Sequence, residues 1–164
     1  MVGKVNNGFY NVAIALQHER MVIAVGAFRR FMDELLAFIR GGERDGKPLA
    51  ADPIVRNKVA SLATEVEALY GLYWQTAWAI DKGRSLETEG SCLKLFASEL
   101  SVLISKVTMD ILGPRGLLER GSTWAYMDGR PATGYLSSIS GPIGAGASEI
   151  QRTIIATRGL GLPR

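Results

Sequence analysis

Few side chains in this sequence could carry metal or nucleophilic chemistry. The chain has one histidine, His18, and one cysteine, Cys92. A diiron site in a helical bundle needs two Glu-x-x-His pairs, and the usual zinc sites need several Cys or His ligands. Both kinds of metal site are therefore excluded. Nothing pairs recognisably with His18 to activate a serine or cysteine nucleophile.

The adjacent residues Glu19 and Arg20 are the best candidates for acid–base chemistry. Glu19 lies beside an apolar stripe that includes Leu16 and Ile23. Desolvation beside such a stripe makes a carboxylate a stronger base. The alternative is an exposed or ion-paired glutamate on a helix flank, and the spacing alone favours that alternative.

Two glycine-bearing turns could present backbone amides to a phosphate. They are the turn from Gly113 to Gly116 and the loop from Gly144 to Gly146. The Gly-Lys-Ser/Thr sequence of a Walker loop does not occur. Ordinary helix termination explains both turns more simply.

The elements that must position these residues are helices. Apolar residues recur mostly at three- to five-residue steps, which predicts buried helical stripes. Three long helices are predicted, namely one over 9–39 ending at Gly41-Gly42, one from the N-cap Asp52 to Gly83, and one from about Ser85 or Thr88 to Gly113-Pro114.

Residues 115–147 are predicted to form a long loop, because the Gly- and Ser-rich part over 134–148 has no helical or strand period. A short helix could form at 124–127 or at 135–139. The run Ser148-Glu149-Ile150-Gln151 is then a capping box that predicts a short final helix up to Gly159. The fold class is therefore all-α, an up-and-down four-helix bundle with three long helices, a long loop and a short terminal helix.

Composition favours a globular protein with one domain over residues 1–164. The net charge of +3 comes from 19 Lys and Arg against 16 Asp and Glu. The two signs alternate along the chain instead of forming a basic stripe, so nucleic-acid binding is not expected. No apolar run approaches the roughly 20 residues of a membrane span, and no signal peptide is recognisable. The single cysteine fits a reducing cytoplasm.

The C-terminal sequence resembles the closing signature of acyl-CoA dehydrogenases. The similar residues are Gly144–Ala156, which include Ser-Glu-Ile-Gln-Arg, and Arg158–Arg164, which include Leu-Gly-Leu-Pro. The segment from Asn7 to Arg20 looks like the first helix of that family's C-terminal domain. The segment Asp110–Gly116 is similar to its flavin-proximal turn.

The resemblance implies the C-terminal helical domain of an FAD-dependent enzyme, with the family's N-terminal helical and middle β domains absent. The implied reaction converts an acyl-CoA thioester to a trans-2-enoyl-CoA and passes electrons to an electron-transfer flavoprotein or an equivalent acceptor. The implied assembly is a homo-oligomer or a heteromer with a related subunit. We expect the isolated domain to be inactive and not to retain FAD.

The family places its catalytic glutamate at one of two positions. The loop position corresponds here to Ala145, which cannot accept a proton. The helix position, just before an arginine, corresponds to Glu19, so the resemblance implies Glu19 and Arg20 as catalytic residues. The flavin contacts implied by the resemblance are Arg44, Asp110, Gly113, Gly116, Ala147, Ser148 and Glu149.

Other interpretations stay open at this point. The chain could be a helical assembly module without catalysis, or the partner subunit without a base in a heteromer, and Ala145 favours both. An acyl-CoA-oxidase-like or nitroalkane-oxidase-like flavoenzyme would share the fold. Acyl chain length and branching do not follow from the sequence.

Overall fold

The computed structural model describes residues 3–84 and 86–163, without the side chains of Ala13, Gln17, His18, Arg20 and Glu87. Its helices are α1 (Gly8–Glu19), α2 (Val25–Gly41), α3 (Pro53–Asp81), α4 (Glu87–Leu112), α5 (Arg130–Ser138) and α6 (Ser148–Ile154). Short helical turns cover Arg20–Val22, Leu49–Ala51, Gly113–Leu117, Tyr126–Gly129 and Ile155–Gly159.

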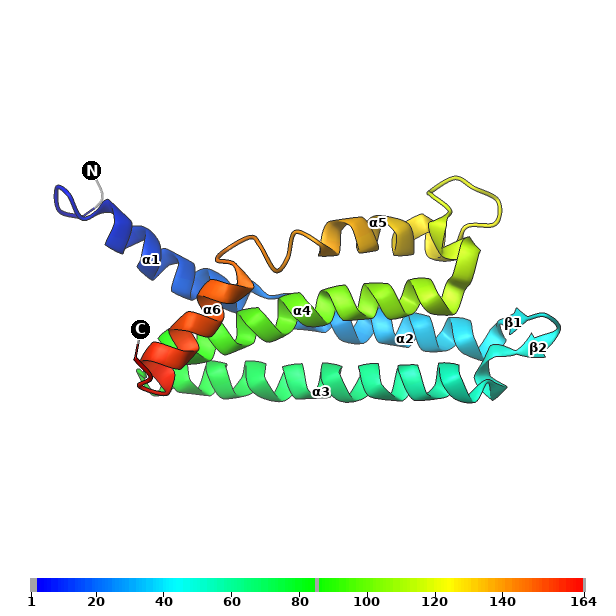
Figure 1. Ribbon diagram of the computed structural model, residues 1–164, viewed down its shortest axis with the longest axis horizontal. Coiled ribbons are helices and arrows are strands. Elements are labelled where there is room, and N and C mark those ends of the chain that lie inside the picture. Colours follow the sequence, from blue (N-terminus) through cyan, green and yellow to red (C-terminus); the bar gives the residue numbers. More distant parts are fainter. Residues whose placement is uncertain (1–2, 85, 164) are drawn as a thin grey trace.

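Four helices form an up-and-down bundle. Figure 1 shows α2, α3, α4 and α5 side by side with alternating directions, while α6 crosses α4 near the opposite end from the hairpin. The all-α prediction is therefore confirmed. None of the helices in the described ranges combines the length and hydropathy that a membrane span requires.

The core of the bundle is built from leucines of its three long helices. Leu35 of α2, Leu62 and Leu69 of α3, and Leu93 of α4 are completely or almost completely buried. They belong to one continuous apolar cluster. Burial of this apolar surface is the main contribution to the stability of the bundle.

Helix α3 begins where the sequence predicts. Oδ1 of Asp52 accepts hydrogen bonds from the backbone amides of Ile54 at 2.8 Å and Val55 at 3.4 Å. Pro53 occupies the first turn, where its missing N–H costs nothing.

A small hairpin connects α2 to α3 at one end of the bundle. Its strands are β1 (Glu43–Arg44) and β2 (Lys47–Pro48), which pair in antiparallel register. Asp45 and Gly46 between them have φ of 53° and 74°. Positive φ at both central positions is typical of the tight hairpin turn that Asp-Gly favours.

The predicted single helix over 9–39 is wrong in one respect. The chain leaves helical geometry at Ile23 and Ala24, where the amide of Val25 donates to the carbonyl of Ile23 at 2.7 Å. The local sequence Val22-Ile23 is β-branched and therefore a poorer helix former. Because of this break, α1 projects from the bundle (Figure 1), and Phe9, predicted in the buried stripe, is 81% exposed.

Residues 115–147 are more ordered than their lack of periodicity predicts. Helix α5 forms at 130–138, overlapping the second of the two segments proposed from the sequence. Arg130 at its start pairs with Glu34 of α2 at 2.8 Å. Packing against α4 and α2 therefore stabilises α5, which local helix propensity alone does not predict.

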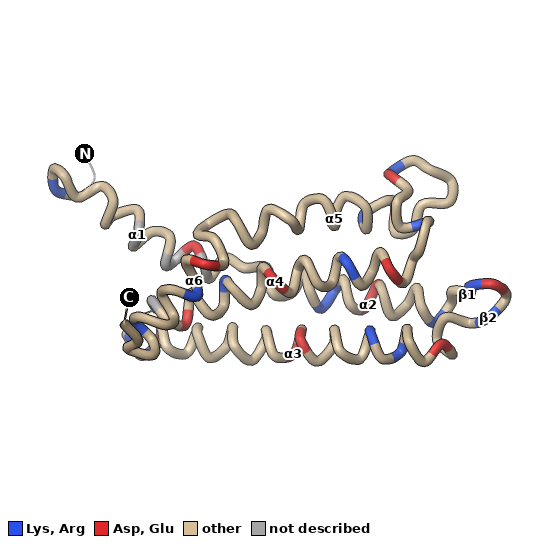
Figure 2. The backbone as a smooth tube through the Cα atoms, viewed as in Figure 1, with Lys and Arg blue, Asp and Glu red and all other residues tan. Residues whose placement is uncertain are grey.

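Ion pairs on the surface join neighbouring helices at their edges. Arg29 of α2 makes two hydrogen bonds to the Glu67 carboxylate of α3, at 3.0 and 2.6 Å. Arg152 of α6 donates to Glu99 of α4 at 2.6 Å. Figure 2 shows that basic and acidic residues are mixed along the helices.

Candidate active site

A cavity that contains a carboxylate and an amine lies where the α1–α2 break faces α4 and the loop before α6. We call it the Glu19 cavity, and its volume is about 510 Å³. Its lining is apolar apart from a few groups. The lining residues are Glu19, Val22, Ile23, Phe28, Lys94, Ala97, Ser98, Ser140, Gly141, Gly144 and Ala145.

The break between α1 and α2 places Glu19 in this cavity. Glu19 ends α1 and is exposed, so it lies at the rim rather than in the interior. Val22 and Ile23 follow it along the same wall. A ligand bound against these apolar side chains would exclude water from the space beside the carboxylate.

The opposite wall is the loop over residues 140–147. Lys94 of α4 is only 6% exposed and donates from Nζ to the carbonyl oxygen of Gly141 at 3.1 Å. Within the loop, the amide of Ser148 donates to the carbonyl of Pro142 at 2.8 Å. These bonds hold Ala145, which has a left-handed φ of 53°, at the cavity wall. The two residues that the family resemblance marks as base positions thus line one cavity.

Other groups considered from the sequence contribute less. The side chain of Arg20 lies outside the described part of the chain, and so does that of His18. Burial raises the pKa of the Cys92 thiol, with the nearby charge of Glu89 as a second cause. A thiol with a raised pKa is mainly protonated at neutral pH and is a weak nucleophile. Among the residues described, no cluster of three or more His, Cys, Asp or Glu could hold a metal ion.

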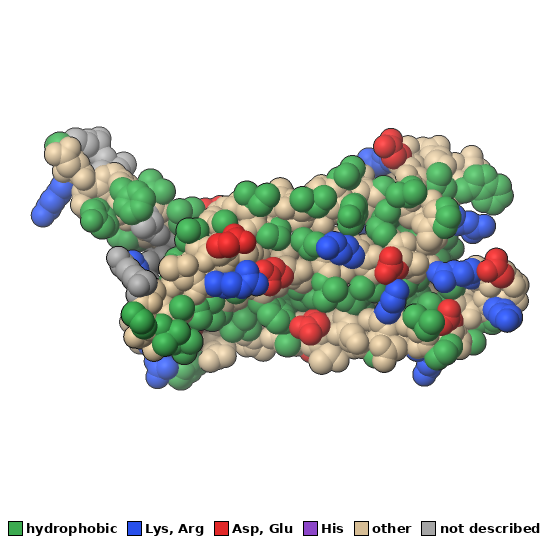
Figure 3. Space-filling model, in the orientation of Figure 1, with side chains coloured by type: hydrophobic (Ala, Val, Ile, Leu, Met, Phe, Trp, Pro, Cys, Tyr) green, Lys and Arg blue, Asp and Glu red, His purple; other side chains and the backbone are tan. Residues whose placement is uncertain are grey.

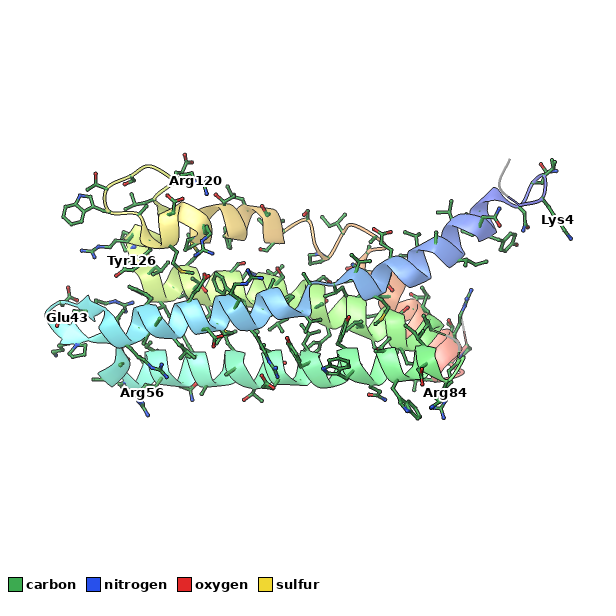
Figure 4. All side chains as sticks on the ribbon, turned by 180° about the vertical axis from the view of Figure 1, so that it is seen from behind. Lys4, Glu43, Arg56, Arg84, Arg120 and Tyr126 are labelled. Atoms are coloured by element: carbon green, nitrogen blue, oxygen red, sulfur yellow. The ribbon has the colours of Figure 1, made fainter. Side chains whose placement is uncertain are left out.

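A second cavity of about 400 Å³ lies at the hairpin end of the bundle, and we call it the hairpin cavity. Arg44 and Gly113 line it together, while Nη2 of Arg44 donates to the carbonyl of Ile111 at the end of α4. Glu43 and Tyr126, both labelled in Figure 4, lie at this same end.

Two further residues of the predicted flavin set lie beside the hairpin cavity. The Asp110 carboxylate pairs with Lys58 of α3 at 3.0 Å, in an ion pair on the surface of the bundle. Gly116 is buried, and a Cβ there would meet the sulfur of Met109 at 3.1 Å and Cβ of Leu112 at 3.2 Å. Close packing is thus a structural reason for glycine at this position.

The predicted capping box at the start of α6 is wrong. The N-cap is Ala147, and no side chain caps the helix. The amide of Gln151 donates to the carbonyl of Ala147, and its Nε2 donates to the carbonyl of Gly146 at 3.2 Å. The helix begins one residue earlier than a Ser148 cap would allow, so the Ser148 hydroxyl lies inside the first turn.

The start of α6 does offer groups that fit a polar ligand, since the Ser148 hydroxyl can donate a hydrogen bond and the side-chain carbonyl oxygen of Gln151 can accept one. Oγ of Ser148 and Oε1 of Gln151 are buried and have no hydrogen-bond partner in the described ranges. Buried polar atoms are normally satisfied, so an orphaned hydroxyl beside first-turn amides fits the carbonyl-rich edge of a flavin ring. Glu149 is exposed on the other side of the same turn.

The predicted flavin residues lie in two places. Arg44, Asp110, Gly113 and Gly116 gather at the C-terminal end of α4, whereas α6 packs on its N-terminal half through the Glu99–Arg152 pair. From Glu99 to Ile111, a helix rises by about 18 Å. A single chain therefore presents two separate groups of candidate flavin contacts.

Sequence reasoning missed Lys94 and Phe28 as residues of the Glu19 cavity. Lys94 follows Leu93 and precedes Phe96 within an otherwise apolar helical pattern, which was the available signal. Phe28 carries no signal of its own, because a phenylalanine in an apolar stripe is usually a core residue.

The fold and the Glu19 cavity define a helical-bundle domain that can hold an apolar ligand beside a carboxylate. The family model described as acyl-CoA dehydrogenase, C-terminal domain, matches residues 6–160. The chain therefore belongs to the acyl-CoA dehydrogenase C-terminal domain family, a family of flavoprotein oxidoreductases.

Individual relatives agree with this membership. The mitochondrial isovaleryl-CoA dehydrogenase of Solanum tuberosum is 28% identical over 158 residues, which cover 94% of this chain and 36% of that protein. The solved structure of the Tcur3481–Tcur3483 steroid ACAD has a TM-score of 0.88 at 26% identity, covering 99% of this chain and 41% of that chain. The ChsE4–ChsE5 complex from Mycobacterium tuberculosis has a TM-score of 0.86 at 27% identity, covering 99% of this chain and 42% of that chain. The chain thus spans well under half the length of each of these proteins.

Proposed function

We propose that residues 1–164 form the C-terminal helical domain of a longer FAD-dependent enzyme that dehydrogenates acyl-CoA thioesters to trans-2-enoyl-CoA. One observation carries this proposal. Glu19 and Ala145, the two positions where a base is expected in the family, line one apolar cavity. Glu19 has the only carboxylate among the described residues that line it.

In this proposal, Glu19 removes a proton from the α-carbon of the bound thioester. Its carboxylate oxygen takes the proton, and the apolar wall of Val22, Ile23 and Phe28 holds the acyl group and excludes water. FAD, when bound, supplies the acceptor for the hydride that leaves the β-carbon. Lys94 keeps the loop that carries Ala145 against α4 and so shapes the opposite wall.

The residues at the start of α6 and those around the hairpin cavity are the proposed flavin contacts. Since the two groups are separated along α4, we infer that they contact flavins of different copies, or distant parts of one flavin. The proposed assembly is accordingly an oligomer, either of identical chains or with a related subunit as in the ChsE4–ChsE5 complex. The proposed electron acceptor is an electron-transfer flavoprotein or an equivalent protein.

A second function is favoured by Ala145. A chain without a carboxylate in the loop could be the silent partner in a heteromer, with the base supplied by the other subunit. The two functions differ in what Glu19 does, because in a silent partner this residue has no role in proton transfer.

Anaerobic reduction of the complete enzyme tests the proposed reaction. The protein that joins this domain to the family's other two domains would be loaded with FAD and mixed with butanoyl-CoA and longer saturated acyl-CoAs. We expect loss of the oxidised flavin band together with formation of trans-2-enoyl-CoA, identified by mass spectrometry. An unchanged flavin spectrum with every acyl-CoA of the series would contradict this function.

A further inference from the structure

A groove on the outside of the bundle lies between the last turns of α2 and the first turns of α3. We call it the α2–α3 groove, and its volume is about 340 Å³. None of the described residues that line it also lines the Glu19 cavity or the hairpin cavity. The α2–α3 groove is therefore a separate site and not an extension of either cavity.

The floor of the α2–α3 groove is apolar. It consists of Ile39 of α2 and of Val55 and Val59 of α3, which are buried members of the core cluster. The groove stays open above them because Ala60 and Ala63 of α3 have short side chains. An apolar chain laid along this floor would lose its contact with water, which favours binding.

Two arginines lie at one end of the α2–α3 groove. Arg40 is in the last turn of α2, and Arg56, labelled in Figure 4, is in the first turn of α3. Nη1 of Arg56 donates to the carbonyl of Ala50 at 3.4 Å. In the described part of the chain, neither guanidinium forms a salt bridge, and no acidic residue lines the groove. Both arginines therefore have positive charge and N–H donors available for an anion.

The charge and the apolar surface are separated along the α2–α3 groove. Because α2 and α3 run in opposite directions (Figure 1), Arg40 and Arg56 lie together at the hairpin end, whereas Leu36 and Ala63 lie at the other end. From residue 56 to residue 63, α3 rises by about 10 Å. This arrangement fits a ligand that has an anionic group at one end and an apolar chain behind it.

The size of the α2–α3 groove favours a small molecule over a protein helix. Small-molecule sites usually have volumes of roughly 300–1,000 Å³, whereas a stable protein partner covers about 800 Å² of each surface. The groove, at about 340 Å³, falls in the range of small-molecule sites. A planar guanidinium matches a carboxylate with two parallel hydrogen bonds, so the arginines favour a carboxylate as the anionic group.

We propose that the α2–α3 groove binds the carboxylate anion of a free fatty acid. The carboxylate lies between Arg40 and Arg56, and the hydrocarbon tail covers Ile39 and Val59. The inference goes beyond the proposed function, because the ligand is a free acid and no residue of the Glu19 cavity takes part.

Methyl NMR of the 164-residue chain tests this site. The δ1 methyl of Ile39 would be labelled with ¹³C, and the chain would be titrated with decanoate, acetate and decyltrimethylammonium. Acetate has the anionic group without the tail, and decyltrimethylammonium has the tail with a cationic group. We expect decanoate to shift the Ile39 methyl to saturation and the other two compounds to leave it unshifted at the same concentrations. No shift with decanoate, or equal shifts with decanoate and decyltrimethylammonium, would overturn the inference.

The double substitution Arg40→Gln and Arg56→Gln tests the anionic end. We expect decanoate to bind at least about tenfold more weakly, because hydrogen bonds between charged groups are lost. The matched control is Arg30→Gln, which changes an exposed arginine of α2 outside the groove and should leave binding unchanged.

Ala60→Leu tests the apolar part of the α2–α3 groove. Leucine is well tolerated in a helix, and its side chain would occupy the space of the tail. We expect decanoate to bind at least about tenfold more weakly, since full burial of each methylene group strengthens binding by about fourfold. The matched control is Ala68→Leu, which changes another exposed alanine of α3 that does not line the groove.

The two kinds of variant address the two ends of the ligand independently. If either the double arginine variant or Ala60→Leu binds decanoate as its control does, the α2–α3 groove is not the site and the inference is overturned. The proposed function is unaffected by that result, because these variants leave every residue of the Glu19 cavity unchanged.

Discussion

Glu19 and Ala145 lie on opposite walls of one cavity, and only one of them can exchange a proton. A glutamate at the loop position and one at the helix position would reach the same bound ligand from different sides. In the proposed function, the residue type at each position therefore decides which wall supplies the base. In this chain, the carboxylate is on the wall formed by the α1–α2 break.

Lys94 gives a test of how the loop wall is held. Replacing Lys94 by Met keeps the apolar stem but removes the donor to the Gly141 carbonyl. We expect the amides of Gly144 and Ser148 to exchange with solvent at least about tenfold faster, equivalent to about 1.4 kcal/mol of lost local stability. Hydrogen exchange followed by NMR measures this directly.

Lys106→Met is the matched control, since Lys106 is exposed on the same helix. Equal exchange rates in the two variants would mean that Lys94 does not fasten the loop.

The candidate site could be predicted only in part from the residues. Glu19 could be predicted as a site residue because Arg20 follows it and the pair matches the family's pattern. Lys94 and Phe28 could not be predicted as site residues, because their place in the cavity depends on the loop over 140–147 folding back onto α4. That contact joins residues 47 positions apart, and no local pattern encodes it.

At the scale of elements, the long helices follow directly from periodicity and caps. The bounds of α3 and α4 agree closely with the predicted ones because their stripes are regular and a proline marks one end of each. The break before α2 was missed because apolar spacing continues through it. Packing of Val25 against the core, rather than local propensity, fixes where the helix restarts.

The cap of α3 can be tested by Asp52→Ala. This substitution removes the acceptor for the amides of Ile54 and Val55. We expect the free energy of unfolding to fall by about 1 kcal/mol, within the usual range of about 0.5–2 kcal/mol for a lost N-cap. Urea unfolding followed by circular dichroism measures the change.

Asp81→Ala at the other end of α3 is the control. An acidic residue there is unfavourable to the helix dipole, so its removal should change stability by less than about 0.5 kcal/mol. A comparable loss of stability in both variants would argue against a specific capping role for Asp52.

At the scale of the molecule, large apolar side chains remain exposed outside the bundle core. On α1 they include Phe9, Tyr10, Val12 and Ile14, and Figure 3 shows hydrophobic side chains gathered there. On α3, no charged residue occurs between Glu67 and Asp81, and Figure 2 shows this half of the helix free of charge. Trp74 and Trp78 in that half are 63% and 50% exposed.

We expect the chain to self-associate through the uncharged half of α3. Two exposed tryptophans one helical turn apart form an apolar patch of the kind that marks interfaces. Sedimentation velocity at about 50 micromolar should show dimers or larger species, because a dimer with a micromolar dissociation constant is populated at this concentration. The double substitution Trp74→Glu and Trp78→Glu should return the chain to a monomer.

Leu117→Glu, at the other end of the molecule and at least as exposed to solvent as the two tryptophans, should leave the association unchanged. A wild-type monomer at this concentration would rule out the α3 interface.

The 164-residue chain should not retain FAD. Its candidate flavin contacts form two groups separated along α4, so one chain offers each flavin only part of its contacts. We expect less than about a tenth of the chains to keep FAD after desalting, because few hydrogen bonds and little apolar burial oppose dissociation. Retention of one flavin per chain or per dimer, read from the visible spectrum, would disprove this expectation.

Proton removal by Glu19 is the central claim, and stopped-flow flavin reduction in the complete enzyme tests it most directly. Glu19→Gln keeps the shape and hydrogen bonding of the side chain but removes its basic oxygen. We expect acyl-CoA to reduce the flavin at least about a hundredfold more slowly, with acyl-CoA binding changed less than about twofold. Glu119→Gln, which alters an exposed carboxylate that lines neither the Glu19 cavity nor the hairpin cavity, should react at the wild-type rate. Reduction at full speed in Glu19→Gln would contradict the account and assign the base to another subunit.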